Sequence, residues 1–239
     1  GVQVFTPYGA TEALPVANIG SDEILTETRF ATEQGKGVCV GRTVPGVTVH
    51  VIRISDDPIP TWDESLCVPP GVVGEFVVRG PVVTKRYFKR DAATKLAKML
   101  DERTGEVLHR MGDVGYRDEQ GRLWFCGRKS HRVETPHGTY FTDMVEPVFN
   151  MVTDVARTAL VGVERNGVKH PVLCVERWCH LHFSGMRVRR GHIDWSQIVV
   201  SLRDEGVKHS HTARVRTFLE YPGLFPVDVR HNSKIFREK

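Results

Sequence analysis

The chain has 239 residues, of which 40% are hydrophobic and 26% are charged, and its formal net charge is +4. These values are ordinary for a globular protein of one large or two small domains. The small excess of Lys and Arg is far from the clustered basic signature of nucleic-acid-binding proteins. No apolar run reaches the roughly 18 residues that a membrane helix requires. We therefore expect no nucleic-acid partner and no transmembrane segment.

The five cysteines are scattered and form no C-x-x-C pair. This pattern disfavours a disulfide scaffold and favours a reducing cytoplasm. Residues 1–7 show no basic segment followed by an apolar one, so we expect no signal peptide. They open directly on a strand-like apolar stretch without an initiator Met. We expect that further sequence lies upstream.

The first half of the chain is predicted to be rich in strands. Residues 8–42 are rich in Gly, Thr and Glu and predict loops around one short strand. Asp91 is expected to cap a helix that runs to Leu100. Alternating or Gly-bounded apolar residues predict strands at 47–54, 74–80 and 122–126.

The sequence changes in character near Gly127, where a short polar segment, residues 129–132, is expected to act as a hinge. A helix is predicted at 142–150, although Pro147 removes one backbone donor there. Asp194 is predicted to cap a second helix. Further strands are predicted at 158–163, 172–175 and 215–219. The expected fold class is α+β, with a β-rich unit at 1–128 and a small α+β domain at 129–239.

One motif near the start, Tyr8-Gly9-Ala10-Thr11-Glu12, combines residue types suited to a nucleotide. The ring can stack on a purine, and the Gly admits close backbone approach. The hydroxyl can bind a phosphate, and the carboxylate can hold Mg²⁺, which prefers oxygen ligands. Taken alone, the same residues are typical of a turn between strands.

Three later residues are also of types that can bind parts of a nucleotide. Asp113, after Gly112, can accept both hydroxyls of a ribose, and Arg128 offers a rigid fork of donors. Lys234, in a polar segment near the end, can reach a developing negative charge. In isolation the three would be an Asx-turn, a surface Arg and a basic tail.

The order and spacing of these motifs carry more information than each motif alone. The chain contains Tyr-Gly-x-Thr-Glu, a Gly-Glu-(x)4-Gly segment leading to Tyr87, Arg-x-Gly-Asp, Gly-Arg and a terminal Asn-Ser-Lys-Ile-x-Arg. This succession resembles the adenylate-forming superfamily of acyl-CoA synthetases, luciferases and peptide-synthetase adenylation domains, over almost the whole chain. The resemblance implies that residues 1–128 are the C-terminal part of the large AMP-binding domain. Residues 129–239 would then be the small mobile domain.

The resemblance also implies roles for single residues. Lys234 is expected to be catalytic, bridging the substrate carboxylate and the α-phosphate of ATP as charge develops. Glu12 is expected to hold Mg²⁺, and Ser130 is expected to be the hinge. The resemblance implies seven further nucleotide-binding residues. Tyr8 and Phe125 would lie at the adenine, and Asp113 and Arg128 at the ribose. Gly9, Ala10 and Thr11 would lie along the nucleotide, with Thr11 near the α-phosphate.

Two departures from the superfamily pattern refine this interpretation. The Ser-, Thr- and Gly-rich phosphate loop, which lies upstream of the first motif in the superfamily, is absent from the 239 residues. We therefore expect that this chain by itself catalyses no ATP–pyrophosphate exchange. In addition, the Lys-rich turn of coenzyme A ligases is replaced by residues 133–138, with Glu134 where Lys is common.

That replacement, together with residues 127–133 and 226–235, resembles the β-lactone synthetases of bacterial olefin biosynthesis. This branch activates a 2-alkyl-3-hydroxy fatty acid as its adenylate, and the 3-hydroxyl then closes a β-lactone with loss of AMP. The resemblance also implies that other enzymes of olefin biosynthesis are candidate partners. A fatty-acyl-CoA ligase, a fatty-acyl-AMP ligase and a non-catalytic interaction module remain as alternatives.

A structural zinc site is a further alternative that the sequence raises. Its candidate ligands are Cys174, Cys179, His180, His182, His209 and His211. Their spacing does not match the C-x-x-C or H-x-x-x-H pairs that zinc sites normally show, so we do not expect zinc.

Overall fold

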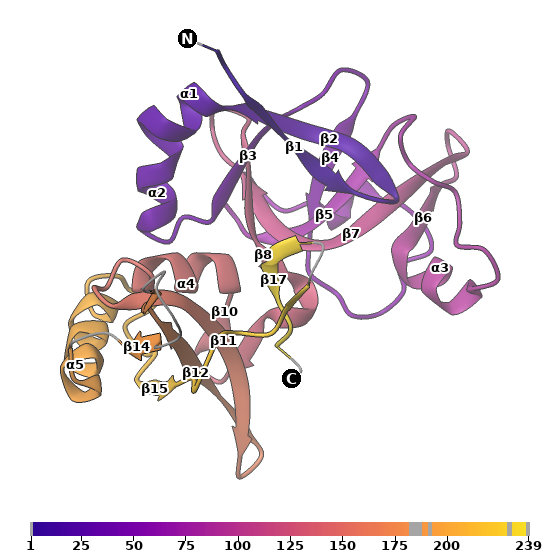
Figure 1. Cartoon of the computed structure of the whole chain (residues 1–239). Helices are drawn as coiled ribbons and strands as arrows, with labels where there is room; N and C mark the ends of the chain where they lie inside the picture. Colours follow the sequence, from indigo (N-terminus) through magenta and orange to yellow (C-terminus); the bar gives the residue numbers. More distant parts are fainter. Residues whose placement is uncertain (1, 182–187, 191–192, 229–230, 238–239) are drawn as a thin grey trace. The chain divides into compact units, whose positions relative to one another are not determined.

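The computed structural model describes residues 2–181, 188–190, 193–228 and 231–237 (Figure 1). Contacts divide the chain into two compact units, one of residues 1–32 and 36–130 and the other of residues 33–35 and 131–239. The α+β class that the sequence predicts is confirmed. In the described part of the chain, no helix is long and apolar enough to cross a membrane.

The first unit is built on an eight-stranded antiparallel sheet in the order β1-β2-β3-β8-β7-β5-β4, with β6 paired to β7. Short helical segments connect its strands. The strands are β1 (Phe5–Ala10), β2 (Ala13–Gly20), β3 (Val38–Thr43), β4 (Thr48–Ile52), β5 (Gly74–Arg79), β6 (Lys98–Asp101), β7 (Glu106–Arg117) and β8 (Leu123–Arg128). The helices are α1 (Ser21–Glu23), a π-helical turn (Ile24–Thr28), α2 (Arg29–Glu33), α3 (Asp91–Ala97) and 3₁₀ turns at Glu64–Leu66 and Lys129–His131.

Strand β5 lies at the centre of this unit's core, because both of its faces are buried. Phe76 and Val78 pack on one side with Val49 and Val51 of β4. Val77 points to the opposite side, where it joins a cluster with Ile52, Trp62, Met99 and Leu108. Successive side chains of a strand point to opposite faces, so a strand buried on both needs an unbroken apolar run.

Predictions for two segments of the first unit are wrong. Residues 8–42 do not form loops around one strand, since they contain the second half of β1, all of β2, β3 except its last residue, and the helical segment between β2 and β3. The helix from Asp91 ends at Ala97 and is preceded by Arg90 as its N-cap residue. Residues 98–101 pair with 106–109 of β7 in a hairpin, and this strand pairing overrides the helical pattern of the segment.

The second unit contains a three-stranded sheet, β11 (Val155–Arg165), β12 (Val168–Arg177) and β15 (Thr217–Glu220), in which β12 and β15 are parallel. Its helices are α4 (Thr142–Phe149) and α5 (Trp195–Gly206). Three short strand pairs accompany them, β9 (Val133–Thr135) with β10 (Gly138–Tyr140), β13 (Cys179–Leu181) with β14 (Val188–Arg190), and β16 (Val227–Asp228) with β17 (His231–Ile235).

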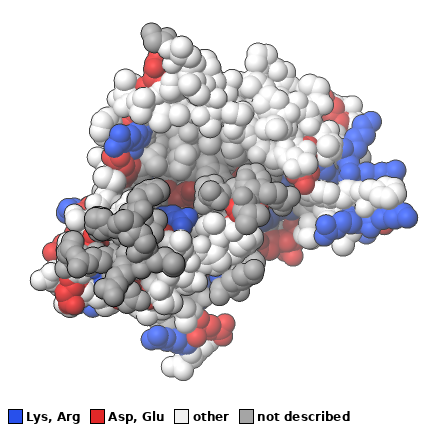
Figure 2. All heavy atoms as spheres, viewed as in Figure 1, with Lys and Arg blue, Asp and Glu red and all other residues white. Residues whose placement is uncertain are grey.

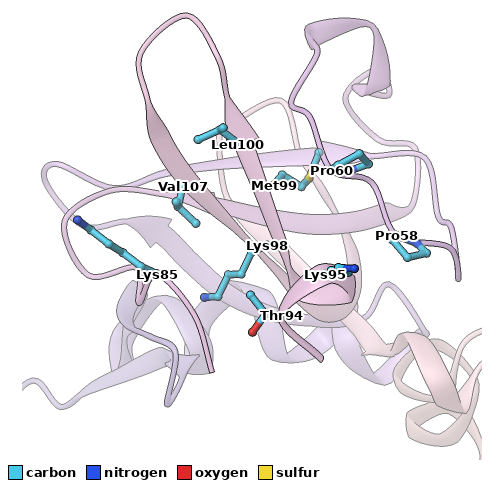
Figure 3. A pocket seen from close by; sticks show the side chains of 9 residues that line it. All are labelled: Pro58, Pro60, Lys85, Thr94, Lys95, Lys98, Met99, Leu100 and Val107. Atoms are coloured by element: carbon cyan, nitrogen blue, oxygen red, sulfur yellow. The ribbon is translucent and has the colours of Figure 1, made fainter. Parts of the chain in front are cut away.

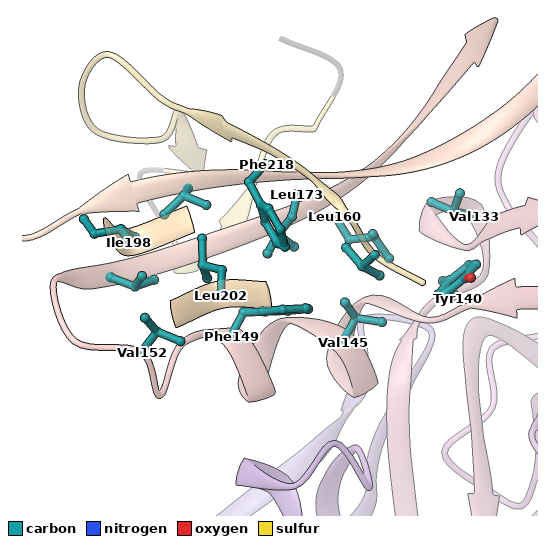
Figure 4. Close-up of a cluster of buried hydrophobic side chains, with 13 residues drawn as sticks. Val133, Tyr140, Val145, Phe149, Val152, Leu160, Leu173, Ile198, Leu202 and Phe218 are labelled. Carbon is teal, nitrogen blue, oxygen red and sulfur yellow. The ribbon is translucent and has the colours of Figure 1, made fainter. Parts of the chain in front are cut away.

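The core of the second unit forms where the two helices meet the sheet. Figure 4 shows Phe149 of α4 and Leu202 of α5 beside Leu160, Leu173 and Phe218 of the strands. The predicted cap of α5 is confirmed, because Asp194 accepts a hydrogen bond from the backbone N–H of Ser196 at 3.1 Å. The helix predicted at 142–150 is also confirmed, with Pro147 inside it.

Candidate functional site

Tyr8, Asp113 and Arg128 form one hydrogen-bonded group on three strands of the first unit. The Tyr8 hydroxyl donates to Oδ2 of Asp113 at 2.6 Å, and Nη1 of Arg128 donates to Oδ1 at 2.7 Å. Asp113 and Arg128 are cross-strand partners on β7 and β8, and Asp113 is only 4% exposed. Three strands, β2, β3 and β8, separate β1 from β7 in the sheet order, so the sheet must curl to bring Tyr8 to Asp113.

The ring of Tyr8 lies against aromatic neighbours inside the unit. Its centroid is 6.2 Å from that of Phe76 and 6.2 Å from that of Phe125. Burial, followed by the negative charge and hydrogen bond of Asp113, raises the pKa of Tyr8 well above its usual value. Tyr8 therefore remains a neutral hydrogen-bond donor at pH 7. The structure thus places the predicted residues Tyr8, Phe125, Asp113 and Arg128 together.

The other residues of the first motif belong to the hairpin between β1 and β2. Ala10 pairs with Ala13, so Thr11 and Glu12 are the two turn residues. A Cβ atom on Gly9 would lie 2.6 Å from the carbonyl oxygen of Ala13. The hairpin's own packing therefore requires glycine at position 9, whether or not a ligand is present.

Glu12 is held by a loop that connects β5 to α3. The Tyr87 hydroxyl donates to Oε1 of Glu12 at 2.8 Å, and the backbone N–H of Thr84 donates to the Glu12 carbonyl at 2.9 Å. Burial alone would raise the pKa of Glu12, but the Tyr87 hydrogen bond and nearby positive charges outweigh it and lower the pKa. Glu12 is therefore an oriented, ionised carboxylate at neutral pH.

Lys98 supports this loop from β6. Its ammonium donates to the Thr84 hydroxyl at 3.2 Å and lies 5.8 Å from the centroid of the Tyr87 ring. Burial lowers the pKa of Lys98 to about 8. The sequence predicts no role for Lys98, because this residue lies in a segment with helical spacing. Its only local signal is a Lys within an apolar stretch, Leu96 to Leu100.

A pocket of about 430 Å³ opens beside Glu12 and Arg128 in the first unit. Pockets of this size are typical of small-molecule sites. Of the predicted site residues, Ala10, Glu12 and Arg128 line it, whereas Tyr8, Gly9, Thr11, Asp113 and Phe125 do not. Its lining residues are Ala10, Glu12, Asp56, Glu75, Tyr87, Leu96, Ala97, His109, Arg110, Met111, Gly112, Arg128 and Lys129.

Three charged residues of the pocket wall, Glu75, Arg110 and Lys129, form a buried ion cluster. Glu75 and Arg110 are each 1% exposed in their side chains, and Arg110 Nη2 lies 2.7 Å from Glu75 Oε2. Lys129 Nζ donates to Glu75 Oε1 at 3.1 Å. Arg110 also donates to the carbonyls of Ser55 and Asp57. The sequence does not predict this cluster, since its members lie up to 54 positions apart.

A second pocket of about 450 Å³ lies beside α3 and is mostly apolar (Figure 3). Pro58, Pro60 and Met99 contribute to its walls, and Lys85 and Lys95 lie at its border. Figure 2 shows Lys and Arg side chains gathered around α3. The exposed basic residues there are Lys85, Arg86, Lys89, Arg90 and Lys95.

The remaining predicted residues belong to the hinge and the second unit. Ser130 lies in the 3₁₀ turn Lys129–His131, and the two units divide after it. Lys234 lies in β17, but its side chain is outside the described residues. Glu134 is an exposed residue of β9 that pairs with Arg132 at 2.9 Å.

Among the side chains that the structure describes, no group of three or more His, Cys, Asp or Glu is placed to hold a metal ion. The side chains of Cys179, His180 and His182 from the zinc alternative lie outside the described residues.

His109, on the pocket wall, should make stability depend on pH. It is 3% exposed and pairs across strands with Lys98. Burial, then the charge of Lys98, lowers the pKa of His109 to about 4, although Glu12 acts in the opposite direction. The ordinary pKa of about 6.5 applies in the unfolded chain, which therefore binds the proton first as pH falls. Protonation of the unfolded chain therefore lowers the free energy of unfolding as pH falls from ~6.5 to ~4, by up to roughly 3 kcal/mol in total. Above pH ~6.5 His109 is neutral in both states, and this loss is absent.

Urea unfolding at pH 7 and pH 5 measures this effect. The difference in unfolding free energy between the two pH values should shrink in His109→Gln, because Gln does not titrate. An unchanged difference would show that His109 is protonated in the folded protein.

Comparison with known proteins places the chain among relatives, although no protein-family model matches it. It is 49% identical over 240 aligned residues to an olefin β-lactone synthetase from Xanthomonas campestris, covering 99% of the chain and 41% of that protein. The chain thus spans about two fifths of the relative's length and matches its C-terminal part.

Solved structures agree with this relationship. An amide bond synthetase from Marinactinospora thermotolerans superposes with a TM-score of 0.69 at 25% identity, over 94% of this chain and 39% of that one. An O-succinylbenzoate coenzyme A synthetase from Bacillus subtilis, in complex with ATP and magnesium ion, shares the fold at 20% identity with a TM-score of 0.69, over 99% of this chain and 41% of that one. The succession of motifs, the sequence identity and the shared fold together show that the chain belongs to the adenylate-forming superfamily.

Proposed function

We propose that this chain supplies the C-terminal part of an ATP-dependent β-lactone synthetase that acts on a 2-alkyl-3-hydroxy fatty acid. The observation that carries the proposal is the 49% identity, over nearly the whole chain, to a protein of that activity. The hydrogen-bonded group of Tyr8, Asp113 and Arg128 supports it, because all three are residues that the superfamily resemblance assigns to the nucleotide. The pocket lined by Glu12, Ala10 and Arg128 supports it in the same way.

The residues present fit a bound magnesium ion and nucleotide. Mg²⁺ is usually held by one or two carboxylates together with substrate phosphates. Glu12 offers an oriented carboxylate on a pocket wall, with a lowered pKa that keeps it charged. The ion would neutralise phosphate charge during the reaction. We therefore assign Glu12 to Mg²⁺. Gly9, Ala10 and Thr11 are assigned to the phosphates and their surroundings. The nucleoside is assigned to Tyr8, Phe125, Asp113 and Arg128.

The hydrogen bonds of Asp113 bear on how this residue would bind the nucleoside. Both of its oxygens already accept a hydrogen bond, one from Tyr8 and one from Arg128. A ribose hydroxyl bound at Asp113 would join or replace these donors, because a carboxylate oxygen can accept more than one hydrogen bond. Arg128, with a side chain that is 41% exposed, is the partner that can move to admit the sugar.

The proposed reaction has two steps. The substrate carboxylate attacks the α-phosphorus of ATP, and pyrophosphate leaves while Lys234 stabilises the negative charge that develops. The 3-hydroxyl oxygen then attacks the acyl carbonyl carbon, its proton is released, and AMP leaves as the ring closes. Positioning contributes most here, since the attacking hydroxyl and the acyl carbon belong to one molecule. Ser130 is the proposed hinge between the two units, and other olefin-biosynthesis enzymes are the proposed partners.

An assay without coenzyme A separates this function from thioester formation. We expect the full-length protein, supplied with ATP, Mg²⁺ and a 2-alkyl-3-hydroxy acid, to release AMP together with a β-lactone. The matched substrate without the 3-hydroxyl should yield the adenylate and no lactone. Strict dependence of AMP release on coenzyme A would instead identify a fatty-acyl-CoA ligase. Adenylate as the final product with both substrates would identify a fatty-acyl-AMP ligase.

A further inference from the structure

The hairpin that carries Lys234 is formed by β16 and β17. Among the described residues, β17 pairs only with the two-residue β16, through Val227 with Ile235 and Asp228 with His231. It does not extend the three-stranded sheet of the second unit. A single short hairpin is marginally stable in water, so contacts at its two ends can help to set its position.

The C-terminal end of the hairpin is held by an ion pair between Arg237 and Glu146. Nη1 of Arg237 lies 2.7 Å from Oε1 of Glu146, and Nη2 donates to Oε2 at 3.1 Å. The side chains are only 13% and 12% exposed. One charge-assisted hydrogen bond beside a second close N–O contact restricts the orientation of the guanidinium. The chain is thus fixed three residues after Lys234.

Glu146 is itself fixed within the core of the unit. It lies on α4, and its Oε1 accepts the backbone N–H of Leu160 on β11 at 2.7 Å. Its backbone carbonyl accepts from the Thr158 hydroxyl at 3.3 Å. One carboxylate therefore connects a helix, the central sheet and the C-terminal strand.

The N-terminal end of the hairpin is held in a similar way. The backbone N–H of Phe225 donates to Oε2 of Glu176 at 2.6 Å, and both residues are buried. Glu176, on β12, also pairs with Arg157 at 3.0 Å. In addition, the N–H of Phe236 donates to the carbonyl of Pro226 at 2.8 Å and closes the base of the hairpin.

We propose that Glu146 and Arg237 are positioning residues for adenylate formation, because their ion pair sets where the hairpin places Lys234. This inference rests on the proposed function, in which Lys234 stabilises charge at the α-phosphate. A group of that kind must lie within hydrogen-bond distance of the charge, and a misplacement of about 1 Å can cost ~100-fold in rate. Arg237 acts through the backbone of β17 and touches no substrate.

The test is a double-mutant cycle in the full-length protein, with adenylate formation followed as ATP–pyrophosphate exchange. Arg237→Ala should lower kcat by about 10- to 100-fold and change KM for ATP by less than about twofold, since the nucleotide residues lie in the first unit. In a Lys234→Ala background, Arg237→Ala should have no further effect. Arg237→Lys, which keeps one charged contact, should restore part of the rate and guards against misfolding of the Ala variant.

Arg177→Ala is the matched control for lost stability. Arg177 is a buried Arg of the same unit, and its ion-pair partners Asp154 and Glu220 lie outside the hairpin. It should lower Tm like Arg237→Ala while leaving kcat unchanged. Equal rate losses from Arg237→Ala with and without Lys234 would overturn the inference, as would a wild-type rate in Arg237→Ala beside an inactive Lys234→Ala. A wild-type rate in Lys234→Ala would instead overturn the proposed role of Lys234 and this inference with it.

Discussion

Lys234→Ala in the full-length protein should reduce adenylate formation by about 100-fold or more. The reason is electrostatic, because one charged donor at a developing oxyanion contributes roughly 10²–10³ in rate when water is excluded. The loss should appear in kcat, while KM for ATP stays close to the wild-type value, since the proposed nucleotide residues belong to the first unit. ATP–pyrophosphate exchange measures this step separately from ring closure.

Lys208→Ala is the matched control for this experiment. Lys208 is an exposed lysine of the same unit, with a side chain that is 60% exposed and paired to Glu205 at 2.7 Å. Its removal should leave the exchange rate unchanged. A wild-type rate in Lys234→Ala would contradict the catalytic assignment and favour the alternative in which this unit is a non-catalytic interaction module.

Glu75→Gln should destabilise the first unit by about 3–5 kcal/mol. The substitution removes the negative charge that compensates Arg110 and Lys129, and it leaves the buried guanidinium of Arg110 without its ionic partner. The carbonyls of Ser55 and Asp57 still accept from Arg110, but neutral acceptors do not balance its charge. Urea denaturation measures the change in unfolding free energy.

Glu64→Gln provides the same chemical change at the surface. The ion pair of Glu64 with Arg103 is exposed on both sides, with side-chain exposures of 77% and 68%. Exposed pairs contribute about 0–1 kcal/mol, so this variant should be close to wild type. Comparable losses in the two variants would show that the Glu75 cluster is solvated in solution. A large loss at Glu75 alone supports its role in holding the pocket wall.

Helices and strands were predictable from the sequence where the pattern of apolar residues or a single capping residue determines the secondary structure. The strands β4, β5 and β8 follow from apolar periodicity or Gly-bounded apolar runs, and the cap of α5 follows from Asp194 before an apolar stripe. The prediction failed at residues 98–101, which have helical spacing but pair with β7. Pairing with a neighbouring strand depends on that strand and on the core beneath it, and it can override the helical preference of the segment.

The sequence by itself determined the family, because the motifs follow one another in a fixed order that a linear chain preserves. It also determined which residues are candidates for nucleotide binding. Only the tertiary structure decided which of them meet. Tyr8 and Asp113 are 105 positions apart, and Glu12 and Tyr87 are 75 apart. The curl of the sheet and the loop after β5 bring these pairs together.

The structure alone also revealed the two buried ion pairs, Glu75 with Arg110 and Glu146 with Arg237. In the sequence these are ordinary charged residues, which are usually solvated. Burial makes them important, because a charge removed from water needs a partner whose position only the folded backbone can fix. The sequence therefore specified the chemistry of the candidate site, whereas the fold decided which charges orient and support it.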